Sequence, residues 1–590
     1  MPMTSRLRSA ALAVALALPL LVVGCRTATP ASSATPIGEV QGRGAMSPLL
    51  DREVAVEGIV TLVFRDGRGG VFVQSLVPDA DAATADGVFV VPKEGAAAPA
   101  PGTRVLVRGR VAELGDGPGL TAVVDADVET QGEAPLPAPV ALAAPPADWE
   151  ALEGMRVTVD VPLVVSGNDA LVRFGEVDLA FGGRLFTPTE QVAPGEPAKR
   201  RLAENLARRI VLDDARADEN PEAIGWLPAP LSDAAPLRAG STLSGITGVL
   251  DERFGGYRLQ AEAPVATIVQ APRPAPPAIE GRVHVAGMNL LNLFNGDGTG
   301  GGFPTARGAR TPEAYTRQLA KHVASITALD PAIIAAQEME NDGFSPESSI
   351  QRLVAALDAA QPGARWQAVA PAERPGTDQI SVAILYRADR VEAVGAPAVL
   401  TGGPFAYGSR PPLAQSFRID GGVPFTLVSV HLKSKGGCAE ADAANRDQGD
   451  GQACFNAQRA AAAEALGRWA SADPTGSGAT AVALVGDFNA YAEEDPMRGL
   501  REAGWIDPLA GGDPDKAYSF VFDGQAGRLD HVLVNAPMQA RLRGIAKWHS
   551  NSDESLAFAY DGPLGRAGEP TPWRASDHDP VLFGLEPPAR

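Results

Sequence analysis

Short apolar runs broken by glycine dominate the first half of the chain. Residues 104–111 place Val105, Val107 and Val111 on one face and arginines on the other, which is the two-residue period of a half-buried strand. Similar runs occur at 54–60, 70–74 and 87–91. Short strands with glycine kinks predict a small β-barrel over residues 48–133.

A second β-rich region is expected at 149–270, after a stretch rich in proline and alanine that predicts a linker. Its closing segment, 242–250, repeats the pattern of residues 104–111 and indicates a second barrel-like unit. The strand order of the first region resembles an oligonucleotide-binding (OB) fold. The four prolines in residues 271–279 predict a hinge before the last part of the chain.

From residue 281 to residue 590 the pattern changes to alternating strands and helices. Strands are expected at 282–290, 332–336, 379–386, 425–430, 481–485, 529–534 and 580–585, and helices at 311–328, 348–360 and 455–470. This order predicts a two-sheet α/β sandwich. The expected fold class is therefore α/β, with a C-terminal sandwich preceded by a β-rich, OB-like barrel region.

Polar side chains follow the apolar runs of several of these strands. Asn289 lies near the end of its run, and Glu338, His431 and Asp487 come just after theirs. Each of them alone is compatible with an ordinary solvated or structural residue. Because strand ends meet at one edge when two sheets stack, we expect the four side chains to line a single rim.

The segments Gly486-Asp487-Phe488-Asn489 and Ser576-Asp577-His578 complete a recognisable set with His431 and Asp530. Their types and order resemble the endonuclease/exonuclease/phosphatase family of metal-dependent phosphodiesterases. The resemblance implies that the C-terminal region hydrolyses phosphodiester bonds with the help of a divalent cation.

The resemblance also implies metal ligands. Glu338 and Asn289 correspond to ligands of the main cation, an oxygen site that suits Mg²⁺ or Mn²⁺. Asp577 is a candidate second-metal or water ligand. The acidic loop at 446–452 offers carboxylates that are also candidate ligands for Ca²⁺.

Catalytic and phosphate-binding roles follow in the same way. Asp487 would orient or deprotonate the attacking water, and Asn489 would hold that water or a phosphate oxygen. His578 would face the scissile phosphate, with its ring fixed by Asp530, and His431 would stabilise developing negative charge. The expected phosphate contacts are Arg387, Lys433 and Lys435. His531 follows Asp530 inside an alternating strand and is interpreted as structural.

Three features favour a nuclease within this family. These are the OB-like region, the stretch 431–436 that leads into the acidic loop, and the segment 518–525 ahead of Asp530. DNA, or alternatively RNA, is the expected substrate. The alternatives are a lipid or small-molecule phosphodiesterase, for which no aromatic-rich docking loop is evident, and a non-catalytic nucleic-acid-binding protein of the cell surface.

The formal net charge of −20, from 71 acidic and 51 basic residues, argues against binding nucleic acid through a general basic surface. It does not exclude a phosphodiesterase, because bound cations and a few local basic residues can reverse the field inside one cleft.

The N-terminus resembles a lipoprotein signal peptide over residues 1–25. Arg6 and Arg8 precede an apolar stretch at 10–23, and Cys25 stands at the expected site of cleavage and acylation. A polar tether at 26–47 would follow, so an exported protein anchored at the outer membrane or cell surface is expected. An ordinary signal peptide, and hence a secreted protein, is the alternative.

Export also bears on the other cysteines of the chain. An exported compartment is oxidising, so a disulfide between Cys438 and Cys454 is expected. Two free buried thiols are the alternative.

Overall fold

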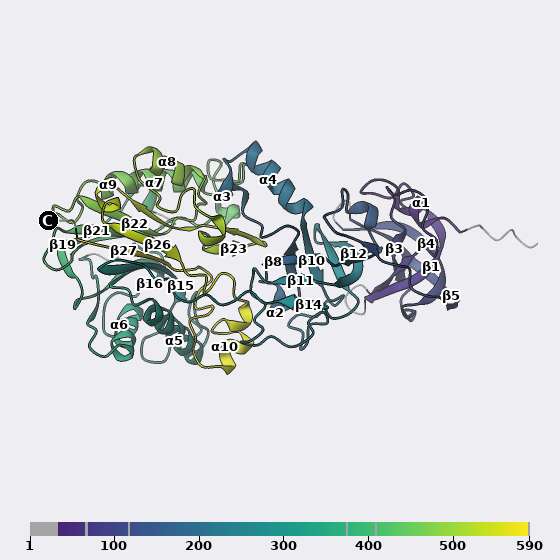
Figure 1. Cartoon of the computed structure of the whole chain (residues 1–590), viewed down its shortest axis with the longest axis horizontal. Helices are drawn as coiled ribbons and strands as arrows, with labels where there is room; N and C mark the ends of the chain where they lie inside the picture. Colours follow the sequence, from purple (N-terminus) through teal and green to yellow (C-terminus); the bar gives the residue numbers. More distant parts are fainter. Residues whose placement is uncertain (1–33, 65–68, 116–118, 373–375, 407–409, 588–590) are drawn as a thin grey trace, which may run out of the picture.

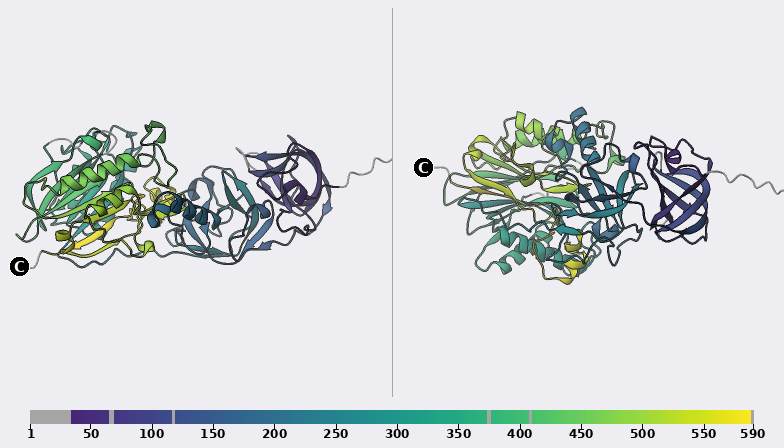
Figure 2. Two further views of the ribbon diagram at one scale, coloured as in Figure 1. Left: turned by 90° about the horizontal axis from the view of Figure 1, so that it is seen from above. Right: turned by 45° about the vertical axis from the view of Figure 1, so that its right-hand side comes forward.

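The computed structural model describes residues 34–64, 69–115, 119–372, 376–406 and 410–587. The expected signal peptide and Cys25 lie outside these residues. Three units follow one another along an elongated molecule, with the N-terminal barrel at one end and the C-terminal sandwich at the other (Figures 1 and 2). No helix within the described ranges is long and apolar enough to cross a membrane.

The N-terminal unit is a closed five-stranded barrel. Its strands, in spatial order, are β1 (Glu53–Phe64), β2 (Gly70–Gln74), β3 (Gly87–Pro92), β5 (Leu120–Glu133) and β4 (Thr103–Leu114). Valines that alternate along the strands fill its core, as the two-residue period predicts. Part of the segment expected to be a tether is folded, since α1 (Ile37–Gln41) packs Ile37 and Val40 into this core. The OB resemblance of the barrel stays a prediction.

The middle unit contains one nine-stranded sheet within the described residues, rather than the second barrel expected from the repeated pattern. Its order is β14 (Thr267–Val269), β11 (Thr242–Ser244), β8 (Leu163–Gly167), β9 (Val177–Ala180), β10 (Arg209–Asp213), β13 (Gly256–Ala261), β12 (Ile246–Arg253), β7 (Arg156–Val159) and β6 (Val140–Ala141). The helices α2 (Leu171–Phe174), α3 (Pro188–Gln191) and α4 (Glu196–Ala207) belong to the same unit, which we call the second domain.

The C-terminal unit is the expected α/β sandwich of two sheets, so the predicted fold class is confirmed. One sheet has the order β17 (Trp366–Ala368), β18 (Ile380–Arg387), β16 (Ile333–Glu340), β15 (Val283–Leu293), β27 (Val581–Leu585) and β26 (Leu542–Lys547). The other has the order β19 (Glu392–Val399), β20 (Arg410–Arg418), β21 (Phe425–His431), β22 (Ala481–Asp487) and β25 (Asp530–Val534).

Apolar side chains hold the sandwich together in three layers. The largest cluster lies between the two sheets and includes Val285, Ile384, Leu427 and Val485. The helices α5 (Pro312–Leu329) and α6 (Ser349–Ala360) cover the outer face of the first sheet, and α7 (Asn456–Ala470) and α8 (Asp495–Glu502) cover that of the second (Figure 1). The short helix α9 (Ala536–Gln539) places Met538 in the cluster between the sheets, and α10 (Pro563–Ala567) lies near α2 of the second domain (Figure 1).

Two further features of the sandwich matter for the site. A small hairpin, β23 (Phe520–Phe522) and β24 (Gln525–Gly527), lies where the sandwich faces the second domain (Figure 1). The expected disulfide between Cys438 and Cys454 is present and closes the acidic loop beside His431.

Candidate functional site

The strand ends bring the expected polar residues to one rim. His431 and Asp487 are register partners across the parallel strands β21 and β22, and Asp487 pairs in turn with Asp530 on β25. In the facing sheet, Asn289 pairs with Gln337, the residue before Glu338. Gln337 Nε2 then donates to Ser429 Oγ at 3.2 Å, which joins the two sheets directly beneath the rim.

Gly486 is required for this close approach. Its φ is +144°, and a Cβ there would lie 2.1 Å from the carbonyl oxygen of Val430 and 2.7 Å from Gln337 Nε2. A side chain would therefore push β22 away from both neighbours. The glycine before Asp487 thus sets the position of the catalytic candidate.

Asp487, Asn489 and His431 form one buried cluster. Asp487 Oδ1 accepts the Asn489 amide N–H at 2.8 Å, and Oδ2 lies 3.2 Å from Asn489 Nδ2 and 3.4 Å from His431 Nε2. Burial raises the pKa of Asp487 to about 7. Burial and the positive charge of Arg410 lower the pKa of His431 well below its usual value, so its ring is neutral at physiological pH.

His578 and Asp530 form a second buried pair. His578 Nδ1 lies 2.7 Å from Asp530 Oδ2. Burial alone would lower the pKa of His578, but the charges of Asp530 and Asp577 outweigh it and raise the pKa well above its usual value. The ring therefore stays protonated at neutral pH and presents Nε2–H away from Asp530.

The metal-ligand candidates also meet at this rim. Burial and the nearby charge of Asp577 raise the pKa of Glu338. Asn289 is 3% exposed, its Oδ1 accepts the N–H of Leu291 at 2.8 Å, and its side chain also bonds to the Glu338 carboxylate. Two adjacent carboxylates and a buried amide oxygen favour a bound cation, and an all-oxygen donor set suits Mg²⁺ or Mn²⁺. The residues present thus fit a divalent cation.

A separate carboxylate cluster lies elsewhere in the chain. Glu150, Glu153 and Glu252 bring one oxygen each within 4.8 Å of the others. Glu153 also accepts the N–H of Thr121 in the barrel, so the cluster lies at the border between the barrel and the second domain. It is not part of the rim.

Arg387 does not reach the site, contrary to our expectation. Because β18 is antiparallel to β16, Arg387 lies beside Ala332, at the end of β16 opposite to Glu338. Six residue steps along the strand separate Ala332 from Glu338, roughly 20 Å. The guanidinium instead bonds to Asp389 at 2.6 Å and to Asp330 at 3.2 Å.

Of the two expected lysine contacts, the structure brings one toward the rim. Lys435 Nζ lies 2.6 Å from both carboxylate oxygens of Glu494, so it holds the disulfide-closed loop against α8 and does not face the site. Lys433 instead lines a cavity of about 600 Å³ together with Arg307 and Arg410.

Arg410 is a residue that the sequence analysis missed. It is the first residue of β20, pairs in register with His431 and is 5% exposed. The sequence gives little indication that Arg410 begins a strand, because Pro411 and Pro412 follow it directly and proline is unusual inside a strand.

Three other histidines bond to main-chain carbonyls. His531 Nε2 lies 2.9 Å from the Ala490 oxygen, which agrees with a structural role. His322 contacts the oxygen of Leu290 at 3.0 Å, and His284 contacts that of Ile279 at 2.9 Å.

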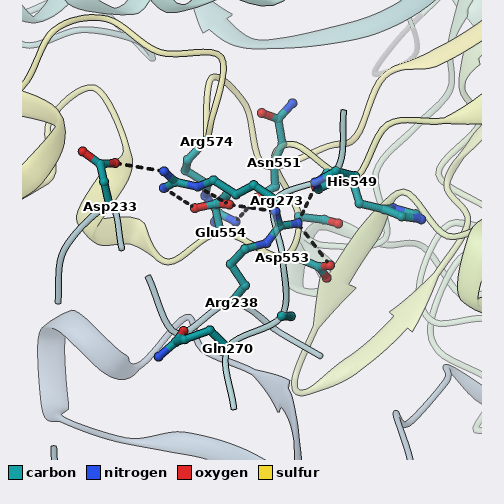
Figure 3. A network of polar contacts seen from close by, with 12 residues as sticks. Asp233, Arg238, Gln270, Arg273, His549, Asn551, Asp553, Glu554 and Arg574 are labelled. Carbon is teal, nitrogen blue, oxygen red and sulfur yellow. Dashed lines mark hydrogen bonds and ion pairs between the residues drawn. The ribbon is translucent and has the colours of Figure 1, made fainter. Parts of the chain in front are cut away.

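A network of ion pairs connects the segment 549–554 of the sandwich with the second domain and with Arg273 just after it (Figure 3). Arg238, 1% exposed, lies 3.1 Å from Glu554, and Arg273 holds the same carboxylate with two bonds of 3.1 and 2.9 Å. A few residues away, Asn551 Nδ2 donates to the main-chain oxygen of His578 at 2.7 Å. The second domain therefore stabilises the segment that supports His578.

Comparisons with known proteins divide the chain in the same way. Residues 290–578 match the Endonuclease/Exonuclease/phosphatase family, and residues 146–270 match a domain of unknown function (DUF8508). No curated protein matches the chain at the level of sequence.

Several solved structures are similar to about half of this chain. The human Nocturnin catalytic domain with bound sulfate is 15% identical and covers 52% of this chain and 95% of its own, with a TM-score of 0.32. D. rerio TDP2 complexed with a single-strand DNA product is 14% identical and covers 51% and 97%, with a TM-score of 0.33. An endonuclease/exonuclease/phosphatase from Bacteroides vulgatus is 14% identical and covers 51% and 97%, with a TM-score of 0.32.

The family match includes Glu338, His431, Asp487, Asp530 and His578, which the structure gathers at one rim. The C-terminal domain of this chain belongs to the endonuclease/exonuclease/phosphatase family.

Proposed function

We propose that this protein is an exported, metal-dependent nuclease that hydrolyses phosphodiester bonds in DNA. The observation that supports the proposal is that two buried pairs of side chains lie at one rim. Asp487, held by Asn489, would accept a proton from the attacking water. His578, held by Asp530, would contact the phosphate as a cation.

Asp487 is the proposed base. Its pKa of about 7, raised by burial, lies close to the pH at which the enzyme would work, where a general base is most effective. Asn489 keeps the carboxylate in place through its main-chain N–H and its side-chain amide. Asp487 would orient the attacking water and accept its proton.

His578 is the proposed phosphate contact. Asp530 holds Nδ1, so only Nε2–H is free to donate to a phosphate oxygen in which negative charge develops. His431 is neutral and adds one N–H donor beside Asp487 without adding charge. The two histidines therefore act differently on the same substrate group.

A divalent cation held by Glu338, Asn289 and Asp577 would supply charge neutralisation at the phosphate oxygens and at the leaving group. Glu338 is positioned for this by a left-handed backbone (φ +60°) at an irregularity within β16 and by the Asn292 N–H, which donates to Oε2 at 3.0 Å.

The cationic cavity beside the rim supports a polyanionic substrate. Arg307, Arg410 and Lys433 line it together with Asp378 and Glu440, so its charged side chains carry one more positive than negative charge in a protein whose net charge is −20. Such a local reversal of charge would attract the nucleic acid backbone into the cleft while the rest of the surface repels it. A nucleic acid thus fits this cavity better than a neutral lipid headgroup does.

A substrate panel tests this function. The purified mature chain is incubated with plasmid, linear DNA, RNA and sphingomyelin, each with EDTA and with added Mg²⁺ or Mn²⁺. We expect DNA cleavage that EDTA abolishes and the metals restore. Hydrolysis of sphingomyelin alone, or DNA cleavage that persists in EDTA, would contradict the proposal.

We also propose that Cys25 becomes the acylated first residue of the mature protein and anchors it at the outer membrane or cell surface. The support is the signal-like sequence that ends at Cys25. Labelled palmitate should enter the wild-type protein and not Cys25→Ser. Equal labelling of both, or of neither, would leave the protein simply secreted or differently attached.

A further inference from the structure

Two aromatic rings extend outward from the catalytic histidine. The ring of Phe520 lies 4.6 Å from that of His578, and the ring of Phe522 stacks beyond it at 6.5 Å with an interplanar angle of 11°. Phe520 is half-buried, whereas Phe522 is 65% exposed. Both lie on the same face of β23, since they are two residues apart in a strand.

The second domain fixes the opposite side of this hairpin. Val521 packs into a buried cluster with Phe186 of that domain. Ala526 and Leu185 are joined by a main-chain hydrogen bond of 2.9 Å, and Thr187 donates to the Ala526 oxygen at 2.8 Å. Strand β24 thus pairs with a segment of the second domain and cannot shift independently of it.

The turn of the hairpin is tied down in the same way. Asp523 forms an ion pair of 2.8 Å with Arg209, and the Gly524 oxygen accepts from Ser166 Oγ at 2.6 Å. A Cβ on Gly524 would lie within 3.0 Å of Asp178, so the turn is packed closely against the second domain. Only the face that carries Phe520 and Phe522 remains open.

We propose that Phe522, backed by Phe520, is a stacking surface for one base of the nucleic acid, next to the phosphate that the enzyme cleaves. The inference rests on the proposed nuclease function and identifies the substrate as a strand with at least one unstacked base. Aromatic side chains of this kind bind bases of any sequence, because every base has a π-face. The second domain then acts as a positioning element for substrate binding.

A membrane contact fits the same hairpin less well. An aromatic hairpin that enters a lipid surface needs a free tip, and here the tip is held by Arg209 and Ser166. Phe522 lies next to this fixed turn, and the Phe520 ring behind it contacts the ring of His578, where the substrate must pass.

Phe522→Ala tests the stacking in the full mature chain. The ring is exposed, so its removal should leave the melting temperature unchanged. Phe254→Ala is the matched control, because Phe254 is 91% exposed on the β12–β13 turn, far from the catalytic rim. Phe522→Trp should keep the function.

The substrates are single-stranded oligonucleotides of one sequence, either intact or with one abasic spacer placed at successive positions around the cleaved bond. We expect Phe522→Ala to raise KM for the intact strand about 10- to 100-fold with a smaller change in kcat. The loss should disappear for the one spacer position at which the missing base would have stacked.

Three results would overturn the inference. The first is an unchanged KM in Phe522→Ala while the wild type cleaves DNA, and the second is an equal loss at every spacer position. The third is lost binding to sphingomyelin vesicles with unchanged DNA cleavage, which would identify the hairpin as a membrane contact. A wild type that cleaves no nucleic acid would refute the proposed function and the stacking with it.

Discussion

His578 Nδ1 lies 2.7 Å from Asp530 Oδ2, and both side chains are buried. This contact reverses the effect that burial alone has on the histidine. In an apolar site an imidazole would lose its proton, whereas here the carboxylate keeps it protonated above neutral pH. The role of His578 as a cation therefore depends on Asp530.

Asp530→Asn should move the alkaline limit of activity to lower pH. The protonated form of His578 is fully present below its pKa and is lost as pH rises through it, so lowering this pKa moves the loss to lower pH. The pH profile of kcat/KM measures the shift. His578→Ala is the control. It should lower activity by about 10²- to 10⁴-fold, and its pH profile should lack the alkaline loss that titration of His578 causes. An unchanged profile in Asp530→Asn would contradict the assigned pairing.

Glu338→Gln should weaken metal binding. The substitution removes one of two adjacent carboxylates and keeps the shape of the side chain. Isothermal titration with Mn²⁺ should show a higher Kd, and added Mg²⁺ or Mn²⁺ should partly restore the activity. Arg387→Gln serves as a control, since Arg387 lies at the opposite end of the sheet. A wild-type Kd in Glu338→Gln would remove Glu338 from the ligand set.

The disulfide between Cys438 and Cys454 should stabilise the loop beside His431. The two residues are 16 apart in sequence, and closing a loop of this length contributes about 3 kcal/mol in the chain-entropy model. Urea unfolding of the double variant Cys438→Ser/Cys454→Ser should show a loss of this order. Peptide mapping without reductant checks the bond itself, and two alkylatable thiols in the native protein would disprove it.

Ionisation of Glu190 should weaken the contact between the second domain and the sandwich at high pH. Its Oε2 accepts the N–H of Arg528 at 3.0 Å, and burial raises its pKa from 4.5 to about 7 despite the charge of Arg528. The folded state binds the proton of Glu190 more tightly than the unfolded state does, so ionisation of Glu190 lowers the free energy of unfolding. This loss is absent below about pH 4.5, grows up to pH 7 and is complete above it.

The wild type should therefore lose up to about 3 kcal/mol between pH 5 and pH 8 relative to Glu190→Gln. Thermal unfolding at matched pH values measures the difference. If the two proteins show parallel stability profiles, Glu190 is ionised in the folded state and the expectation is wrong.

The rim of polar residues could be predicted from the sequence because it is made of strand ends. An apolar run followed by Gly486 and Asp487 identifies both the strand and the point where it stops, and the same holds for His431. The wrong assignment of Arg387 has the same origin. Arg387 also ends a strand, but β18 runs in the opposite direction to β16, and strand direction follows from the topology of the sheet.

The contacts between the second domain and the sandwich could not be predicted from local sequence patterns. Arg238 meets Glu554 across more than 300 residues, and no local pattern marks either residue. Phe520 and Phe522 read as an ordinary short strand until the second domain closes one side of the hairpin. The aromatic surface next to His578 is therefore visible only in the folded chain.

The central claim is that Asp487 acts on the attacking water in a metal-dependent hydrolysis of DNA. Its most direct test is the single-turnover rate of cleavage of a labelled oligonucleotide by wild type and Asp487→Asn, measured across a series of Mg²⁺ concentrations. The account predicts a rate roughly two to four orders of magnitude lower in the variant at every concentration, with no rescue by the metal. Cleavage at the wild-type rate by Asp487→Asn would contradict it.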